Sequence, residues 1–182
     1  MLPKFEVMSQ GQEHPELKWA KENRKAIRKH FSGLKRRTTK SSQGRALDAV
    51  FHEQHDAEFR KRDCLTCANC CRTTSPIFRD RDIDRLAKHL RMRPSDLIEA
   101  HLQLDDEGDY VLRVAPCPFL DLADNKCSVY EHRPAACREY PHTNRKNMAG
   151  ILDLTERNTR VCPAVASMVR GMMGTTEPRR PG

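Results

Sequence analysis

The eight cysteines constrain this chain more than any other feature of its sequence. Four of them form the pattern C-x2-C-x2-C-C, and the other four are dispersed further along the chain. Two intervening residues let the backbone turn so that both thiolates reach one ion, which is why C-x2-C recurs in zinc and iron–sulfur sites. The pattern therefore predicts a thiolate metal-binding protein. Its candidate ligands are Cys64, Cys67, Cys70, Cys71, Cys117, Cys127, Cys137 and Cys162.

The apolar content is too low for a large hydrophobic core. Leu, Ile, Val and Phe make up 34 of the 182 residues. This share lies just under the ~20% below which charged chains are usually disordered. We therefore do not expect a β-sandwich, a large α/β enzyme fold or a membrane span. Because metal–thiolate bonds supply folding free energy that burial does not, we expect a small, α-rich α+β fold with a metal-stapled cysteine domain.

The N-terminal sequence predicts a cytoplasmic protein. Residues 1–18 contain no apolar stretch of the kind found in secretory signals, and no 18-residue apolar run occurs anywhere. In a reducing compartment, clustered cysteines are more often metal ligands or redox groups than disulfides. The even number of cysteines would also suit disulfides if the chain were exported.

The net charge of +8 is unevenly distributed along the chain. Residues 1–63 hold 15 Lys and Arg against 9 Asp and Glu, whereas residues 64–169 hold 15 of each. This division predicts three parts. They are a basic helical arm over residues 1–63 with a linker near 33–44, a cysteine domain over 64–169, and a disordered tail over 170–182.

The basic arm shows a helical period over residues 15–32, with Ile27 and Phe31 on one face, and again over residues 45–62, through Leu47, Val50 and Phe51. Clustered cations gain affinity by releasing counterions from phosphates, so residues 15–62 are a candidate surface for a nucleic acid or an acidic protein. The alternative, which the acidic residues among these cations favour, is two solvated helices packed on the cysteine domain.

Cysteine spacing leaves the metal open. Zinc prefers closed tetrahedral sites of four Cys, or of three Cys and one His. Iron–sulfur clusters prefer C-x2-C-x2-C with a remote fourth Cys, often followed by Pro, and both Cys117 and Cys162 precede a Pro. Neighbouring Cys70 and Cys71 should point in divergent directions, so one of them would serve a second metal, a bridging position or chemistry. Mononuclear, dinuclear and iron–sulfur sites all stay open, as does the grouping of the ligands.

The region between the two cysteine groups predicts a scaffold of short elements. Residues 80–90 place Ile83 and Leu86 on one helical face, and a second helix starts at Pro94 with Ser95 as its N-cap and continues through residue 102. Residues 110–115 predict a strand, and a hairpin turn at residues 124–125 should bring Cys117 and Cys127 together at a small β-ribbon.

Several polar side chains near the second cysteine group are candidates for contacts around the metal. Two arginines flank Cys137, where a guanidinium would stabilise thiolate charge and could donate to sulfur. The alternative is that the arginines pair with Glu131 and Glu139 on the surface. Two of the histidines could also replace a Cys ligand. The full set is Arg133, Arg138, Tyr130, Tyr140, His132 and His142.

The cysteine pattern resembles the YkgJ-type cysteine-cluster family, described as a zinc- or iron-chelating domain with the motif CxxCxxCC. The resemblance covers about residues 64–163, through CLTCANCCR at 64–72, DIDRLAKHL at 82–90, the run CPFLDLADNKCSVYEHRPAACREYPH at 117–142, and Cys162-Pro163. It implies that all eight cysteines are ligands, accompanied by Arg133, Pro134, Arg138, Tyr140 and Pro141.

One position departs from the family's pattern. A Gly commonly precedes the paired cysteines, whereas this chain has Asn69. Asn tolerates a left-handed backbone, so we expect the turn to be kept at this residue.

The sequence does not decide whether the protein is an enzyme, but it favours a function without catalysis. One branch of the family resembles flagellin lysine methylases, but no recognisable methyl-donor site occurs here. A paired carboxylate site, a nucleophile triad and a Gly-rich phosphate loop are also absent from the sequence. Three functions stay open. The protein is a metal-binding protein, an iron–sulfur enzyme or redox protein that acts on another protein, or an adaptor for nucleic acid or an acidic partner.

Overall fold

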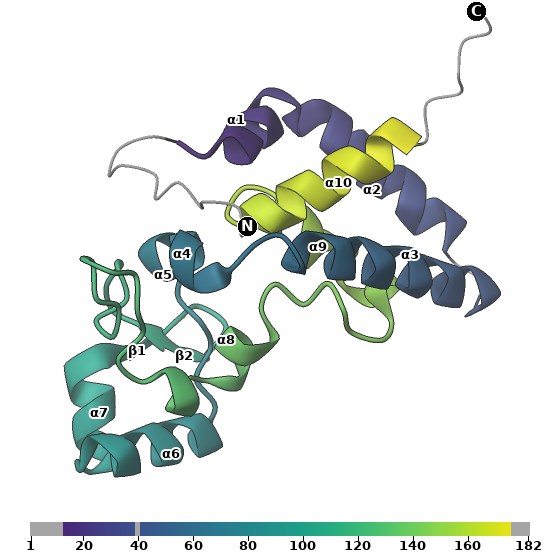
Figure 1. Cartoon of the computed structure of the whole chain (residues 1–182). Helices are drawn as coiled ribbons and strands as arrows, with labels where there is room; N and C mark the ends of the chain where they lie inside the picture. The colour runs from purple at the N-terminus through teal and green to yellow at the C-terminus, as the bar shows by residue number, and fades with distance from the viewer. Residues whose placement is uncertain (1–12, 39–40, 176–182) are drawn as a thin grey trace, which may run out of the picture. The chain divides into compact units, whose positions relative to one another are not determined.

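The computed structural model describes residues 13–38 and 41–175, which form two compact units (Figure 1). One unit combines the residues up to Arg62 with those from Pro141 onward, and the other spans Asp63–Tyr140. Helices dominate both units, and one two-stranded antiparallel sheet is present, which confirms the α-rich α+β prediction. None of the helices in the described ranges is long and apolar enough to cross a membrane.

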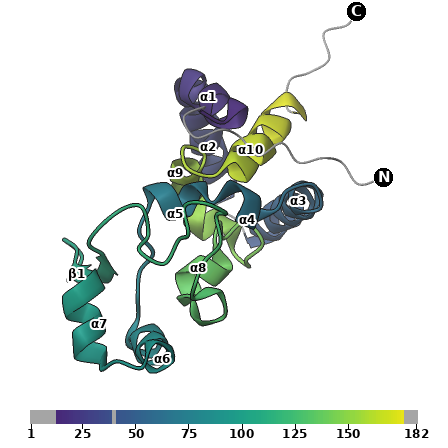
Figure 2. The same cartoon turned by 60° about the vertical axis from the view of Figure 1, so that its left-hand side comes forward.

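In the unit that contains the N-terminal helices, helices are the only regular elements among the described residues. Its helix α10 runs between α1 and α3, as Figures 1 and 2 show, and α2 packs against α9. Its elements are α1 (Pro15–Glu22), α2 (Arg24–Arg37), α3 (Ser41–Phe59), the 3-10 helix η2 (Met148–Ile151), α9 (Leu152–Asn158) and α10 (Pro163–Thr175).

The predicted single helix over residues 15–32 is in fact two helices, α1 and α2. Asn23 separates them, with φ −99° and ψ 14°, and its side-chain Nδ2 donates to the Trp19 carbonyl at 2.9 Å. Asn side chains compete with the helical backbone for such carbonyls. The apolar stripe is nevertheless confirmed, because Ile27 and Phe31 are buried.

Helix α3 buries only part of the apolar stripe that the sequence predicts. Leu47 and Phe51 are buried, whereas Val50 is 43% exposed and was wrongly placed on the buried face. Of the predicted linker near 33–44, residues up to Arg37 belong to α2 and residues from Ser41 belong to α3, while residues 39–40 lie outside the described residues. Residues 170–175 of the predicted tail belong to α10, and the rest lies outside the described residues.

The cysteine-rich unit is built from short elements. Strands β1 and β2 pair antiparallel, with Leu102 opposite Leu112. The elements in chain order are α4 (Cys64–Cys67), α5 (Asn69–Thr73), α6 (Asp80–Leu90), α7 (Pro94–His101), β1 (Leu102–Leu104), β2 (Tyr110–Leu112), the 3-10 helix η1 (Tyr130–His132) and α8 (Ala135–Glu139).

Three details of the predicted scaffold were wrong, although helix α6 has the predicted bounds. The strand predicted over residues 110–115 ends at Leu112. Helix α7 starts with Pro94 at its first position and Arg93 as N-cap, so Ser95 lies inside the helix. Pro suits that first position because its missing N–H has no helical partner there. The helix also ends at His101, because Leu102 begins strand β1, where it is fully buried.

The core of this unit is small. It gathers buried side chains from α6, α7 and the two strands, together with Phe78, Phe119 and Val129. A core of this size leaves much of the ordering to polar contacts, as the low aliphatic content predicts.

Replacing Phe51 by Ala should lower the free energy of unfolding of its unit by about 3–5 kcal/mol, because Phe51 is fully buried and the truncation leaves a cavity. Val50→Ala, one residue earlier on the same helix, is the matched control and should change it by less than about 0.5 kcal/mol. Urea titration followed by far-ultraviolet circular dichroism measures both. Equal effects of the two variants would contradict the packing described for α3.

Candidate metal centre

The four clustered cysteines lie on two very short helices, α4 and α5. Asp63 caps α4, because its carboxylate accepts a hydrogen bond from the Leu65 N–H at 2.9 Å. Ala68 lies between the helices in a left-handed conformation, with φ 45° and ψ 14°. The predicted turn therefore exists, but the left-handed residue is Ala68 rather than Asn69. For an L residue other than Gly, Asn or Asp this conformation costs about 1–2 kcal/mol.

Cys70 and Cys71 do not diverge as expected of neighbouring helical residues. Their Sγ atoms lie 4.0 Å apart and form a thiol–thiol contact. The hydrogen bond from Cys70 is the main cause that lowers the pKa of Cys71 to about 7, with the Arg72 guanidinium acting in the same direction against burial. Cys71 is therefore the thiol of this pair with a marked tendency to ionise near neutral pH.

A hairpin brings Cys117 and Cys127 to the same end of the unit. Leu120 and Cys127 form an antiparallel bridge, and Ser128 N–H donates to the Phe119 carbonyl at 2.9 Å. Asn125 takes the left-handed conformation that its turn requires, with φ 63°. The turn predicted at residues 124–125 is thus confirmed.

Two hydrogen-bonded links join this hairpin to the helices that carry the first cysteine group. Cys117 N–H donates to the Cys71 carbonyl at 2.8 Å. The Arg72 guanidinium donates to Asn125 Oδ1 at 2.5 Å, and Asn125 Nδ2 donates to the Thr66 carbonyl at 3.3 Å. Sequence reasoning found Arg72 only as part of the motif, and nothing but the turn propensity of Asn125 pointed to this role.

The segment that carries Cys137 is held by the buried carboxylate of Asp82 on α6. Asp82 Oδ1 accepts from the Ala135 N–H, in the first turn of α8, at 3.1 Å and from Arg85 at 2.7 Å. Arg85 also donates to the Arg133 carbonyl at 3.0 Å. Burial raises the pKa of Asp82, but these hydrogen bonds outweigh it and hold the pKa below its usual value. Neither Asp82 nor Arg85 was predicted as a site residue.

The thiols of Cys71, Cys117, Cys127 and Cys137 lie close enough to act on one another electrostatically. Burial, together with the charges of the neighbouring cysteines, raises the pKa of Cys117 to about 11 and that of Cys137 to about 12. Burial and Cys71 likewise raise the pKa of Cys127. These four residues are named the four-thiol group here. Cys71 ionises readily, whereas the other three thiols resist ionisation unless a cation compensates their charge.

Of the other four cysteines, Cys70 contacts the four-thiol group, because its Sγ lies 4.0 Å from the Cys71 Sγ. Cys64 is exposed, while Cys67 and Cys70 are partly exposed. Cys162 belongs to the other unit, together with His142, and is buried just before α10. Across residues 13–38 and 41–175, no group of three or more His, Cys, Asp and Glu side chains meets the geometry for holding a metal ion as they stand.

Among the aromatic and basic candidates, Arg133 acts on the last cysteines of this unit. The Arg133 guanidinium stacks 3.6 Å from the centre of the Tyr130 ring and lowers the pKa of both Cys127 and Cys137 against the effect of burial. Arg138 donates to the Arg133 carbonyl at 2.7 Å. His132 stacks on His89 at 4.0 Å between ring centres. A hydrogen bond from either arginine to a sulfur stays a prediction.

Three comparisons with known proteins bear on this unit. Residues 63–163 match the family model CxxCxxCC, described as a "Putative zinc- or iron-chelating domain". The chain is also 26% identical over 82 residues to "Uncharacterized protein MJ0661" of Methanocaldococcus jannaschii, with 44% of each chain covered. The chain thus spans less than half the length of this curated relative. No solved structure matches.

Replacing Asp82 by Asn should lower the free energy of unfolding by about 1–3 kcal/mol, because an amide NH2 would then face one of the N–H donors that the carboxylate accepts. Asp84→Asn on the same helix is the matched control, since Asp84 is exposed and the charge change is the same. Urea titration of both variants measures the difference.

The difference in free energy of unfolding between Asp82→Asn and Asp84→Asn should depend on pH. The pKa of Asp82 is depressed in the folded state, so its contribution is present above the unfolded value of about 3.9 and is lost as pH falls through the lower folded value. The difference between the two variants should hold down to about pH 4 and narrow below it. A difference that grows as the pH falls would contradict the role assigned to Asp82.

Proposed function

The chain belongs to the CxxCxxCC family of zinc- or iron-chelating domains, and we propose that it holds zinc or iron through the thiolates of the four-thiol group. The observation that carries this proposal is the mutual electrostatic effect of Cys71, Cys117, Cys127 and Cys137, which come from four separate segments. Four thiolates match the tetrahedral preference of zinc and of iron–sulfur centres. Hard ions such as calcium and magnesium prefer oxygen ligands.

The donor set explains what a metal would contribute to this unit. A bound ion would compensate the negative charge of the thiolates, and it would cross-link α5, the hairpin and α8. The free energy of metal binding would contribute to the stability of the folded unit, because the site does not exist in the unfolded chain. Since metal binding needs reduced cysteines, we also propose a cytoplasmic location.

An iron–sulfur redox protein or enzyme is the second candidate, favoured by the spacing of Cys64, Cys67 and Cys70. These three thiols lie on α4 and α5, and the Cys70 Sγ contacts the Cys71 Sγ of the four-thiol group. The remaining cysteine of the proposed ligand set, Cys162, is in the other unit. For the basic arm over residues 15–62 we also propose an acidic protein or nucleic-acid partner, supported by the charge excess of residues 1–63.

Purification without oxygen, followed by elemental analysis and a visible spectrum, tests the metal proposal. Stoichiometric zinc in colourless protein supports a zinc site, whereas iron with absorption near ~400 nm supports the iron–sulfur candidate. Reduced, folded protein that contains neither metal and takes up neither on addition would contradict both.

Serine substitution of single cysteines should separate the four-thiol group from the other thiols. Cys117→Ser and Cys137→Ser should each lower the bound metal per chain by at least tenfold and destabilise the unit, because a structural ion and its fold are lost together. Cys64→Ser is the matched control and should retain the metal of the four-thiol group. Elemental analysis and thermal unfolding measure both effects, and equal loss in all three variants would contradict the grouping.

Metal affinity should rise steeply with pH. The pKa values of Cys117 and Cys137, about 11 and about 12, lie far above neutrality, so metal binding must displace their protons. Apparent affinity for added zinc, measured by competition with a chelator of known pH dependence, should therefore still increase between about pH 7 and 9. An affinity independent of pH in this range would mean that these thiols are not ligands.

A further inference from the structure

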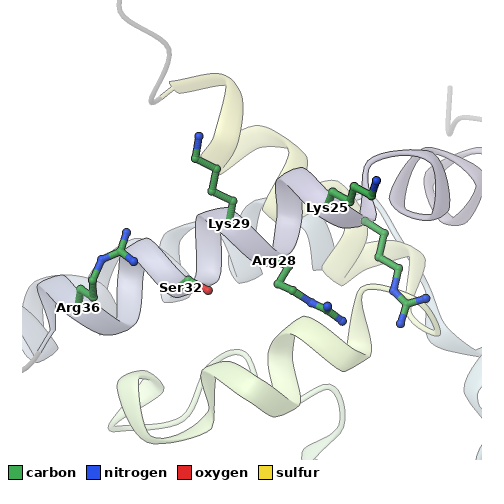
Figure 3. A pocket seen from close by; sticks show the side chains of 6 residues that line it. Lys25, Arg28, Lys29, Ser32 and Arg36 are labelled. Carbon is green, nitrogen blue, oxygen red and sulfur yellow. The ribbon is translucent and has the colours of Figure 1, made fainter.

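Helix α2 carries an unusually uniform charge. Seven of its residues are Lys or Arg, and none is Asp or Glu. Its apolar residues Ile27, Phe31 and Leu34 are buried in the helical unit. Residues that lie four, three and four positions apart share one side of a helix. Figure 3 shows the side chains that follow this spacing along the exposed side, which we call the α2 basic face. They are Lys25, Lys29, Ser32 and Arg36, flanked by Arg24 and Arg28.

Most of this charge is not compensated by residues that the structure describes. Arg28 pairs with Glu156 at 3.7 Å, but Arg24, Lys25, Lys29 and Arg36 form no ion pair with any residue that the structure describes. The first turn of α2 contains no acidic residue, although the positive end of the helix dipole favours one there. An anion on this face would therefore gain from unscreened positive potential.

The character of the face narrows the partner. Its six side chains line an open hollow of about 630 Å³, and Ser32 is the only uncharged one. None of the exposed large apolar side chains in the described ranges lies on α2. Protein interfaces have an apolar, aromatic-rich centre with few charges. A membrane-surface helix needs a free apolar face, which α2 buries. A phosphate backbone needs only cations and polar groups.

We propose that the α2 basic face binds the phosphodiester backbone of a double-stranded nucleic acid without reading its bases. A duplex is favoured over a single strand because α2 exposes no Trp, Tyr or Phe on which unpaired bases could stack. Lys25 and Arg36 lie about 16 Å apart along the helix axis, so the face meets several successive phosphates. The proposal sharpens the partner of the basic arm and is independent of the metal site, since α2 lies outside residues 63–163.

Fluorescence anisotropy of the full chain with labelled DNA and RNA duplexes of about 20 base pairs tests this, over a salt titration. Removing three cations of the face should weaken binding about tenfold or more and reduce the slope of log K against log salt by about 2–3. A control with the same charge change uses exposed cations of the cysteine-rich unit and should stay within about twofold. The test variant is Lys25→Gln/Lys29→Gln/Arg36→Gln, and the control is Arg81→Gln/Lys88→Gln/Arg113→Gln.

Each outcome has a defined meaning. Selective loss in the test variant, with Lys25→Arg/Lys29→Arg retaining affinity and the metal content unchanged, supports the proposal, and the two duplex arms identify DNA, RNA or both as the source of phosphates. Equal loss in both triple variants would show binding by net charge alone and would overturn the assignment to the α2 basic face. Absence of duplex binding at low salt, or tighter binding to polyglutamate or to phosphatidylserine vesicles, would overturn it.

Discussion

The cost of ionising several partly buried, neighbouring thiols is the main physical constraint on the cysteine-rich unit. Burial and the neighbouring cysteines raise the pKa of Cys117 and Cys137, so without a cation these groups stay protonated at neutral pH. Cys71 differs, because Cys70 donates to it and Arg72 lies beside it. The four-thiol group therefore combines one thiol ready to ionise with three that ionise only against a bound positive charge, which is the behaviour that proton-coupled metal binding requires.

Polar contacts hold these thiols in one region where a larger protein would use apolar packing. Asp82 and Arg85 fix the start of α8, and thereby Cys137, to helix α6. Arg72 and Asn125 fix the hairpin to α4 and α5. Each such contact contributes only about 1–3 kcal/mol. A bound metal would add far more, so the two kinds of link complement each other in a unit whose apolar core is small.

Sequence reasoning succeeded where one local signal decides and failed where distant residues compete. The periodicity of residues 80–90 and the turn at Asn125 are local, and both were correct. The prediction that the second helix continues through Leu102 was wrong, because Leu102 pairs with Leu112 in the sheet instead of continuing the helix. Ala68 was missed because no intrinsic preference places Ala in a left-handed turn. The contact between Asp82 and the start of α8 could not be predicted from the sequence, since its partner Ala135 is 53 residues away.

The distribution of ion pairs separates charge that serves folding from charge that is free for binding. In the cysteine-rich unit, where the net charge is close to zero, acidic residues accept from cations within the unit, as Asp82 does from Arg85 and Asp96 from Arg93. Among the residues that the structure describes, only Arg28 and Lys35 of α2 have acidic partners, both on α9. Burial of the apolar stripe explains why α2 is a helix, but it does not require the five further cations of this helix. The nucleic-acid partner proposed above would account for them.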